Sequence, residues 1–384
     1  MTSRPIISDQ RFHGLDFLRA MAMLFGLLFH APLLYYIPGM ADAFKDFGVA
    51  TATIPAMEPW LHLTIQWLHS WRMCVFFIIS GFFAGLVLRK RSPAEFITDR
   101  LVKIGVTMIV FASAFDFLDG RFNGKLEHIW FLYYLMIFSL LIWLLAILPG
   151  NILLGKNNRK SHCEEKFSNS KATFQLLLIA GSLIIFRPIA DNLDGGAIGI
   201  ATNYTSIKFG GLLYFWLWFC AGFWLFDKRD LLYSAGSKFL TIFLGITGVL
   251  VFYFLSPKLN GIFGYKTITP SDTYDYIIFS LLKGLNTFVW VTFLILVSHQ
   301  LMNKPRKFVG WLVTLSFPIY LLHMTPCMLI SAILIGMGLS QILVVFGTVI
   351  ASFLICLLLY YGLIKFTPLS WIILGYKKSW LKPF

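Results

Sequence analysis

The chain consists of long apolar segments separated by short polar ones, and this pattern restricts its fold more than any other feature. Most segments approach the roughly 20 residues that a helix needs to cross the hydrocarbon of a bilayer. Hydrophobic residues make up 58% of the 384 residues and charged residues only 13%, too few for the surface of a soluble protein of this size. The sequence therefore predicts an all-α polytopic membrane protein. We expect ten spans, at about residues 14–37, 61–88, 101–118, 126–148, 173–189, 208–226, 239–256, 274–299, 309–335 and 340–365.

The distribution of Lys and Arg predicts the orientation of these spans. An even number of spans places both termini on one side of the membrane. That side carries 23 of the 32 Lys and Arg residues, and the opposite side carries seven. Because cytoplasmic loops are enriched in Lys and Arg, we expect both termini in the cytoplasm. The formal net charge of +14 would also suit nucleic acid, but the basic residues lie in loops between spans, so we expect no such partner.

We expect residues 1–384 to form a single transmembrane domain. The only polar low-complexity stretch, at about residues 151–171, is typical of a flexible cytoplasmic linker between the first four spans and the last six. The five cysteines show no CxxC spacing and four lie in apolar runs, which indicates small buried side chains and no metal site. The chain contains no GxGxxG, P-loop, HExxH or GxSxG motif, and we expect no bound cofactor.

Three ionisable residues in the first span indicate a functional site. Arg19 and His30 are eleven residues apart, which is about 16 Å of helical rise and places both on one helix face. Asp16 lies one turn before Arg19, on nearly the same face. Ionisable residues inside a membrane are costly and usually functional. The alternative is that Asp16 and Arg19 are interfacial anchors and His30 is a packing histidine.

Other spans place polar side chains at a similar depth. Counted from the cytoplasmic ends, His30, Arg72 and His323 each lie about 21–24 Å deep. Glu127 and His128 open the fourth span from the outer side, slightly above that level. Because embedded charges face the bundle interior or water, we predict one cavity in the outer half of the protein. The outer loops at 38–59, 190–207 and 257–273 are candidates to line it.

Each of these residues also has a structural interpretation. Arg72 could clamp backbone carbonyls, and His323 could hydrogen-bond to a neighbouring helix. Glu127 could simply favour a helix N-terminus through the helix dipole. Lys283, the other basic residue inside a span, is interpreted either as an isolated residue in a tilted helix or as a side chain that reaches toward the interface near the helix end.

The residue types favour acyl transfer. A deep neutral histidine can accept a proton from a hydroxyl, since its pKa lies near working pH. A nearby guanidinium can stabilise a tetrahedral oxyanion or hold a carboxylate. No serine or cysteine nucleophile is paired with a base, which favours direct transfer. Cytoplasmic basic residues around Arg19, Arg89–Arg91 and Arg100–Lys103 would suit a phosphate-rich donor, although membrane topology explains them equally well.

Five segments in order resemble the acyltransferase-3 family of integral membrane acyltransferases. The similarity covers essentially the whole chain. Its segments are DFLRA with the Arg19-to-His30 spacing, SWRMCVFFIISGFF with Arg72, DRLVKIGVTM with Arg100, HIWFLYYL with His128, and FPIYLLHMTP with His323. Within the family the chain is most similar to the branch that succinylates osmoregulated periplasmic glucans of Gram-negative bacteria. That branch pairs two histidines after the IYL segment, whereas here His323 is followed by Met324.

The resemblance implies a multi-pass protein of the bacterial inner membrane with about ten spans. It implies that acyl-CoA arrives from the cytoplasm and that an acceptor is modified on the outer side. It also implies that His30 is essential and that Arg19 belongs to the donor side. Many relatives carry the same motifs and instead acetylate lipopolysaccharide, peptidoglycan or exopolysaccharide.

The mechanism predicted from the sequence is direct transfer. Acyl-CoA enters from the side of Asp16, Arg19 and Arg100, and His30, oriented by Glu127 or His128, deprotonates a glucan hydroxyl. Arg72 stabilises the oxyanion or holds the distal carboxylate of a succinyl group, and membrane lipids surround the domain. Two other classes stay open: a transporter of a polar solute, and a structural partner of a glucan synthase.

Overall fold

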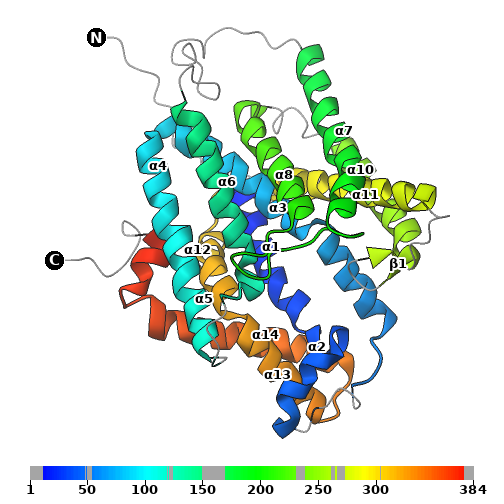
Figure 1. Ribbon diagram of the computed structural model, residues 1–384, viewed down its shortest axis with the longest axis vertical. Coiled ribbons are helices and arrows are strands. Elements are labelled where there is room, and N and C mark those ends of the chain that lie inside the picture. Colours follow the sequence, from blue (N-terminus) through cyan, green and yellow to red (C-terminus); the bar gives the residue numbers. More distant parts are fainter. Residues whose placement is uncertain are drawn as a thin grey trace.

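The protein is almost entirely helical (Figure 1). The computed structural model describes residues 12–375 apart from 48, 50–53, 119, 121–123, 149–168, 231–237, 261–263, 266–272 and 303. Its α-helices are α1 (His13–His30), α2 (Leu33–Tyr36), α3 (Pro59–Lys90), α4 (Pro93–Arg100), α5 (Thr107–Leu118), α6 (Trp130–Ile147), α7 (Asn169–Leu193), α8 (Phe209–Asp227), α10 (Lys238–Leu255), α11 (Thr273–Leu301), α12 (Lys307–Leu322), α13 (Met324–Gly336) and α14 (Gln341–Leu359).

Shorter elements complete or connect these helices. The 3-10 segments are Pro38–Phe47, Glu127–Ile129 and Ser256–Lys258, and the π segments are Leu101–Val106, Tyr360–Ile364 and Trp371–Gly375. Two strands of two residues each, β1 (Leu259–Asn260) and β2 (Gly264–Tyr265), pair antiparallel. Most of the linker predicted at 151–171 lies outside the described residues, and α7 begins at Asn169.

Among the described residues, seven helices are long and apolar enough to cross a membrane, and the pair α12–α13 makes an eighth if it is one bent span. These seven helices are α3, α6, α7, α8, α10, α11 and α14, where α6 is counted with the preceding 3-10 segment and α14 with the following π segment. Helix α1 and the continuous run from α4 through the π segment to α5 correspond to the first and third predicted spans. The prediction of an all-α polytopic membrane protein is therefore confirmed.

Contacts between helix ends agree with the predicted sides. At the side assigned to the cytoplasm, Arg89 at the end of α3 forms an ion pair of 2.8 Å with Asp227 at the end of α8. At the opposite side, the Gln341 side chain at the start of α14 accepts a hydrogen bond of 2.9 Å from the backbone N–H of Glu58, which precedes α3. The identity of the cytoplasmic side stays a prediction from the Lys and Arg distribution.

Helices α3 and α8 form the closest-packed pair in the bundle interior. A Cβ atom at Gly81 would overlap the carbonyl oxygen of Phe219, and one at Gly222 would overlap that of Ile78. Small residues allow two membrane helices to bring their backbones together and gain van der Waals contact. Around this seam Phe77, Phe82 and Trp218 are fully buried. Figure 1 shows α7, α10 and α11 grouped on one side of this pair.

Two of the predicted spans are interrupted in the structure. The span predicted at 14–37 ends at His30, and the span predicted at 309–335 bends by 69° at His323, between α12 and α13. A proline follows each break, Pro32 two residues after His30 and Pro326 three residues after His323. Proline lacks an N–H and its ring collides with the carbonyl four residues earlier, so each helix ends and restarts there. Both histidines consequently lie at helix ends.

The outer loop between α7 and α8 is held together by hydrogen bonds to one carboxylate. The Asp194 carboxylate accepts hydrogen bonds from the backbone N–H groups of Gly199, Gly210 and Gly211, at 2.9, 2.9 and 2.6 Å. These bonds fix residues 194–208 against the start of α8, where the helix dipole also favours a carboxylate. The predicted outer loop at 190–207 thus follows the end of α7 in a hydrogen-bonded conformation, and its residues 197–203 line the cavity described below.

The α3–α8 contact predicts a local cost for any added side chain. Gly222→Ala should lower the midpoint of thermal unfolding in detergent, by the equivalent of roughly 1–3 kcal/mol, because the methyl group collides with the backbone of α3. Gly181→Ala in α7 is the matched control, since nothing lies within 4 Å of its Cβ position. The close packing is wrong if both variants unfold at the same temperature.

Candidate active site

A cavity of about 780 Å³ lies between α1, α3, α6, α7, α11 and α12. Outer segments form its rim, including Met40, Lys125, Ile200 and Leu259. The outer loops proposed from the sequence to line a cleft therefore each contribute to it. Because these segments belong to the side opposite the predicted cytoplasmic ends, the cavity opens toward the predicted extracytoplasmic side.

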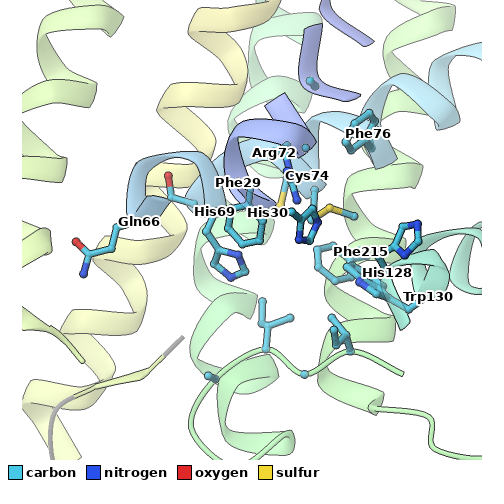
Figure 2. Close-up of a pocket in the computed structure, with 18 of the residues that line it drawn as sticks. Phe29, His30, Gln66, His69, Arg72, Cys74, Phe76, His128, Trp130 and Phe215 are labelled. Carbon is cyan, nitrogen blue, oxygen red and sulfur yellow. The ribbon is translucent and has the colours of Figure 1, made fainter. Parts of the chain in front are cut away.

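Three histidines meet in the wall of this cavity. The ring centroids of His30 and His323 are 5.1 Å apart, and those of His323 and His128 are 5.2 Å apart. His323 is thus the middle member, at the bend between α12 and α13. Figure 2 shows His30 beside Arg72, with His128 and Trp130 on one side and His69 and Gln66 on the other. The sequence placed His128 slightly above the others; in the structure it belongs to the same cluster, because the 3-10 turn Glu127–Ile129 directs it inward.

The backbone around Tyr320 sets the protonation of two of these rings. His323 Nδ1 lies 2.6 Å from the Tyr320 carbonyl oxygen, and His128 Nε2 lies 3.2 Å from the same oxygen. A carbonyl only accepts, so each of these nitrogens carries the proton and donates. In the neutral rings the other nitrogens, His323 Nε2 and His128 Nδ1, are free acceptors, and both are buried without a hydrogen-bond partner. The Tyr320 hydroxyl donates to the His128 carbonyl at 2.7 Å and holds the turn in place.

Arg72 brings a positive charge to the cluster. Its Nη1 donates to the Phe25 carbonyl of α1 at 3.2 Å, and its guanidinium lies 4.4 Å from the centroid of the Phe29 ring. This hydrogen bond to a backbone carbonyl matches the structural interpretation of Arg72 given in the sequence analysis. The Nε–H remains without a hydrogen-bond partner. A Cβ atom at Gly26 would lie 3.3 Å from His323 Nε2 and 3.6 Å from Arg72 Nη1, so the two groups converge on one point.

The remaining predicted site residues lie outside the histidine cluster. Glu127 lies at the exposed rim of the cavity, with a left-handed φ of 42°. Asp16 and Arg19 form an ion pair of 3.1 Å on α1, and Arg100 lies near enough to Arg19 for their charges to interact. These three residues do not line the cavity. They form a separate group at the predicted cytoplasmic end of the bundle.

The cavity also contains polar residues that the sequence reasoning missed. Lys283 is neither isolated nor reaching toward the interface: it is buried, and its Nζ lies 2.7 Å from the Asp191 carboxylate. Arg187 contacts the same carboxylate at 3.0 Å. One signal was present in the sequence, because Arg187 and Asp191 are spaced i, i+4 inside an apolar segment. His69 stacks on Phe29, with ring centroids 5.8 Å apart.

The arrangement suits acid–base chemistry on a neutral or anionic substrate. It offers unprotonated imidazole nitrogens, a fixed guanidinium and a cavity large enough for a sugar-sized group. Among the described residues no group of three or more His, Cys, Asp or Glu side chains is placed to hold a metal ion. Cys74, the thiol that lines the cavity, lies on α3.

Comparisons with known proteins agree with the resemblance drawn from the sequence. The family model described as an acyltransferase domain, acyltransferase-3, matches residues 12–361. The glucans biosynthesis proteins C of Escherichia coli O139:H28 and of Shigella boydii serotype 4 are each 24% identical over 354 residues, covering 83% of this chain and 82% of the relative. No solved structure matches the chain.

If the cavity opens to the extracytoplasmic side, a cysteine introduced at its rim should be accessible to a reagent that cannot cross the membrane. In a variant without the five native cysteines, Ile200→Cys at the rim should be labelled by a membrane-impermeant maleimide in intact cells. Asp227→Cys, also exposed but at the opposite end, should be labelled only after the membrane is permeabilised. Labelling of Asp227→Cys in intact cells, with Ile200→Cys protected, would reverse the orientation.

Proposed function

The chain belongs to the acyltransferase-3 family and is a multi-pass membrane acyltransferase. From this premise we propose that it transfers an acyl group from cytoplasmic acyl-CoA to a sugar hydroxyl of an extracytoplasmic glucan, in the bacterial inner membrane. One observation carries the proposal: His30, His323 and His128 form a continuous cluster beside Arg72 in a cavity of about 780 Å³.

His30 acts as the general base. It lies at the end of α1 in the cavity wall, and its Nδ1 is buried without a hydrogen-bond partner. His323 and His128 each donate an N–H hydrogen bond to the Tyr320 carbonyl, which fixes their orientation, whereas within the described structure no such bond fixes the tautomer of His30. His30 is therefore the ring most able to take up and return a proton. The free Nε2 of neighbouring His323 favours the imidazolium that forms.

Arg72 stabilises the charge that develops during transfer. The acceptor hydroxyl attacks the thioester carbonyl and gives its proton to His30, and the carbonyl electrons become a tetrahedral oxyanion. Arg72 is held by Phe25 and Phe29, and its Nε–H is available to that oxyanion. The attack itself forms the ester C–O bond. Collapse of the intermediate then restores the carbonyl C=O bond and breaks the C–S bond, and the departing thiolate receives the proton from His30.

The donor approaches from the end that carries Asp16, Arg19 and Arg100. Arg19 and Arg100 provide two positive charges for the phosphates of the donor, and Asp16 orients Arg19 through their 3.1 Å ion pair. His30 lies about 16 Å farther along α1 than Arg19. An extended acyl arm would have to cover that distance for its thioester to reach the cavity.

We assign the acceptor and the acyl group as a glucan and succinyl. The name of the relatives, glucans biosynthesis protein C, supports the glucan. The succinyl group rests on the resemblance to a glucan-succinylating branch and on the basic residues of the cavity. Acetylation of lipopolysaccharide, peptidoglycan or exopolysaccharide is the alternative within the same family.

Sealed membrane vesicles test the proposal directly. Labelled succinyl-CoA or acetyl-CoA is supplied on the cytoplasmic face and a periplasmic-type glucan on the other, and the glucan is analysed by mass spectrometry. A succinyl mass increment supports the full proposal, and an acetyl increment corrects the acyl group. If neither donor modifies the glucan but another envelope polysaccharide is acylated, the acceptor is wrong; if none is acylated, the acyltransferase mechanism fails.

His30→Ala should lower the transfer rate by about 10²–10⁴-fold, because the proton of the acceptor hydroxyl loses its base. The matched control is His62→Ala, a histidine of α3 that does not line the cavity. Both variants should insert and unfold like the wild type. Near-full activity of a folded His30→Ala variant would remove this residue from the mechanism.

Arg72→Lys should also lower the rate, by about 10²–10³-fold, although it keeps the charge. A lysine cannot donate to the Phe25 carbonyl and to the oxyanion through a rigid planar fork. The measurement is kcat for acyl transfer at saturating donor. Unchanged kcat in this variant would show that Arg72 serves only as a clamp between α1 and α3.

A further inference from the structure

The cavity has a second polar end, formed by Arg187 of α7 with Lys283 and Asn286 of α11. His69 of α3 lies between this end and the histidine cluster, close enough to Arg72, Arg187 and Lys283 to interact with all three charges. In Figure 2 His69 lies on the side of Arg72 and His30 opposite to His128. None of the steps assigned above uses Arg187, Lys283 or Asn286.

A single carboxylate supports the two cations from behind. Asp191 is completely buried and accepts from Arg187 Nε at 3.0 Å and from Ser280 Oγ at 2.7 Å, and it pairs with Lys283 Nζ at 2.7 Å. Arg187 and Lys283 line the cavity, but Asp191 and Ser280 do not. The cations therefore face the cavity and the acid lies outside it. Two positive charges against one negative charge leave this end with a surplus of one positive charge.

Asn286 adds an uncharged donor that nothing in the described structure satisfies. The residue is completely buried, and both its amide nitrogen and its amide oxygen lack a hydrogen-bond partner. Burying an amide without hydrogen-bond partners is unfavourable, so a group of this kind requires an explanation, and a bound ligand is one that would supply the missing partners. Its position three residues after Lys283 places it on nearly the same face of α11.

Close packing fixes these groups in place. A Cβ atom at Gly284 would lie 2.9 Å from the Ile184 carbonyl oxygen and 3.1 Å from Arg187 Cβ, so α7 and α11 touch at this level. The Thr287 hydroxyl also donates to the Ser70 carbonyl of α3 at 2.7 Å. A preorganised positive site of this kind needs little rearrangement to bind an anion.

We propose that Arg187, Lys283 and Asn286 form a subsite for a carboxylate carried by one of the two substrates. The surplus of one charge matches a monoanion, and a guanidinium, an ammonium and an amide N–H match the planar pair of carboxylate oxygens. The carboxylate is either the distal group of a dicarboxylic acyl chain or an acidic substituent of the acceptor. This inference rests on the proposed function and extends it, because it assigns substrate selection to residues separate from His30 and Arg72.

Succinyl and butyryl donors distinguish a charge effect from a size effect. Both acyl chains contain four carbons, and only succinyl carries a carboxylate. If the acyl chain is the ligand, Lys283→Met should lower kcat/KM for succinyl-CoA about tenfold or more and leave the value for butyryl-CoA unchanged. Lys45→Met, an exposed lysine outside the cavity, is the matched control and should change neither value. The acceptor in this comparison is a neutral glucan, so an equal loss with both donors would indicate a structural role for Lys283 and overturn the proposal.

A second variant tests the charge argument itself. In Lys283→Met the remaining Arg187–Asp191 pair is neutral, so the surplus charge is gone. Adding Asp191→Asn restores a surplus of one through Arg187, and the double variant should recover part of the succinyl preference. Failure to recover any preference in a double variant that transfers butyryl normally would contradict the carboxylate subsite.

A further experiment varies the acceptor and tests whether the carboxylate belongs to it. With butyryl-CoA as donor, the wild type and Lys283→Met are compared on a neutral glucan and on a uronate-containing oligosaccharide. A loss confined to the acidic oligosaccharide would assign the carboxylate to the acceptor. If Lys283→Met alters neither the donor ratio nor the acceptor ratio, the subsite does not exist.

A binding measurement separates this inference from the proposed function. Free succinate should raise the midpoint of thermal unfolding of the wild type, uncharged succinamide should not, and Lys283→Met should lose the effect of succinate. This readout needs no turnover, so it holds even if the protein transfers no acyl group. Equal stabilisation by succinate and succinamide, or an undiminished shift in Lys283→Met, would overturn the proposal.

Discussion

A guanidinium inside an apolar helix bundle needs hydrogen-bond partners and access to water, and the placement of Arg72 in the middle of α3 imposes this requirement here. Arg72 obtains one partner from the α1 backbone at Phe25 and a ring surface from Phe29. Its other edge faces the cavity, which the bundle therefore cannot fill with apolar side chains. The breaks at His30 and His323 bring two imidazoles to the same space, since helix ends rather than continuous helices border it.

One cavity contains two groups of polar side chains with different chemical properties. At one end, the imidazole of His30 is suited to moving a proton, and the guanidinium of Arg72 is suited to stabilising an oxyanion. At the other end, Arg187 and Lys283 lie in front of a buried carboxylate and give a surplus positive charge. His69 connects the two ends through its position near all three cations. In the mechanism that we propose, one end supplies reactivity and the other selects a charged substrate.

Much of this arrangement could be predicted from sequence. Hydropathy located the helices within a few residues, and counting along each span placed His30, Arg72 and His323 at a common depth. The bends were missed because ten continuous spans were assumed, although Pro32 and Pro326 indicate where the helices end. The pairing of Lys283 with Asp191 could not be predicted, since it depends on α11 packing against α7 through Gly284. Nor could the inward turn of His128, which depends on the Tyr320 backbone of a distant helix.

The most direct test is a structure with a bound dethia analogue of acyl-CoA, in which a methylene replaces the thioester sulfur and the carbonyl is retained. With the proposed mechanism, we expect this carbonyl in the cavity within hydrogen-bond reach of Arg72, about 3 Å, with His30 beside it. The nucleotide end should then lie near Arg19 and Arg100. If the analogue binds with its carbonyl away from Arg72 and His30 and leaves the cavity empty, acyl transfer does not take place at the histidine cluster.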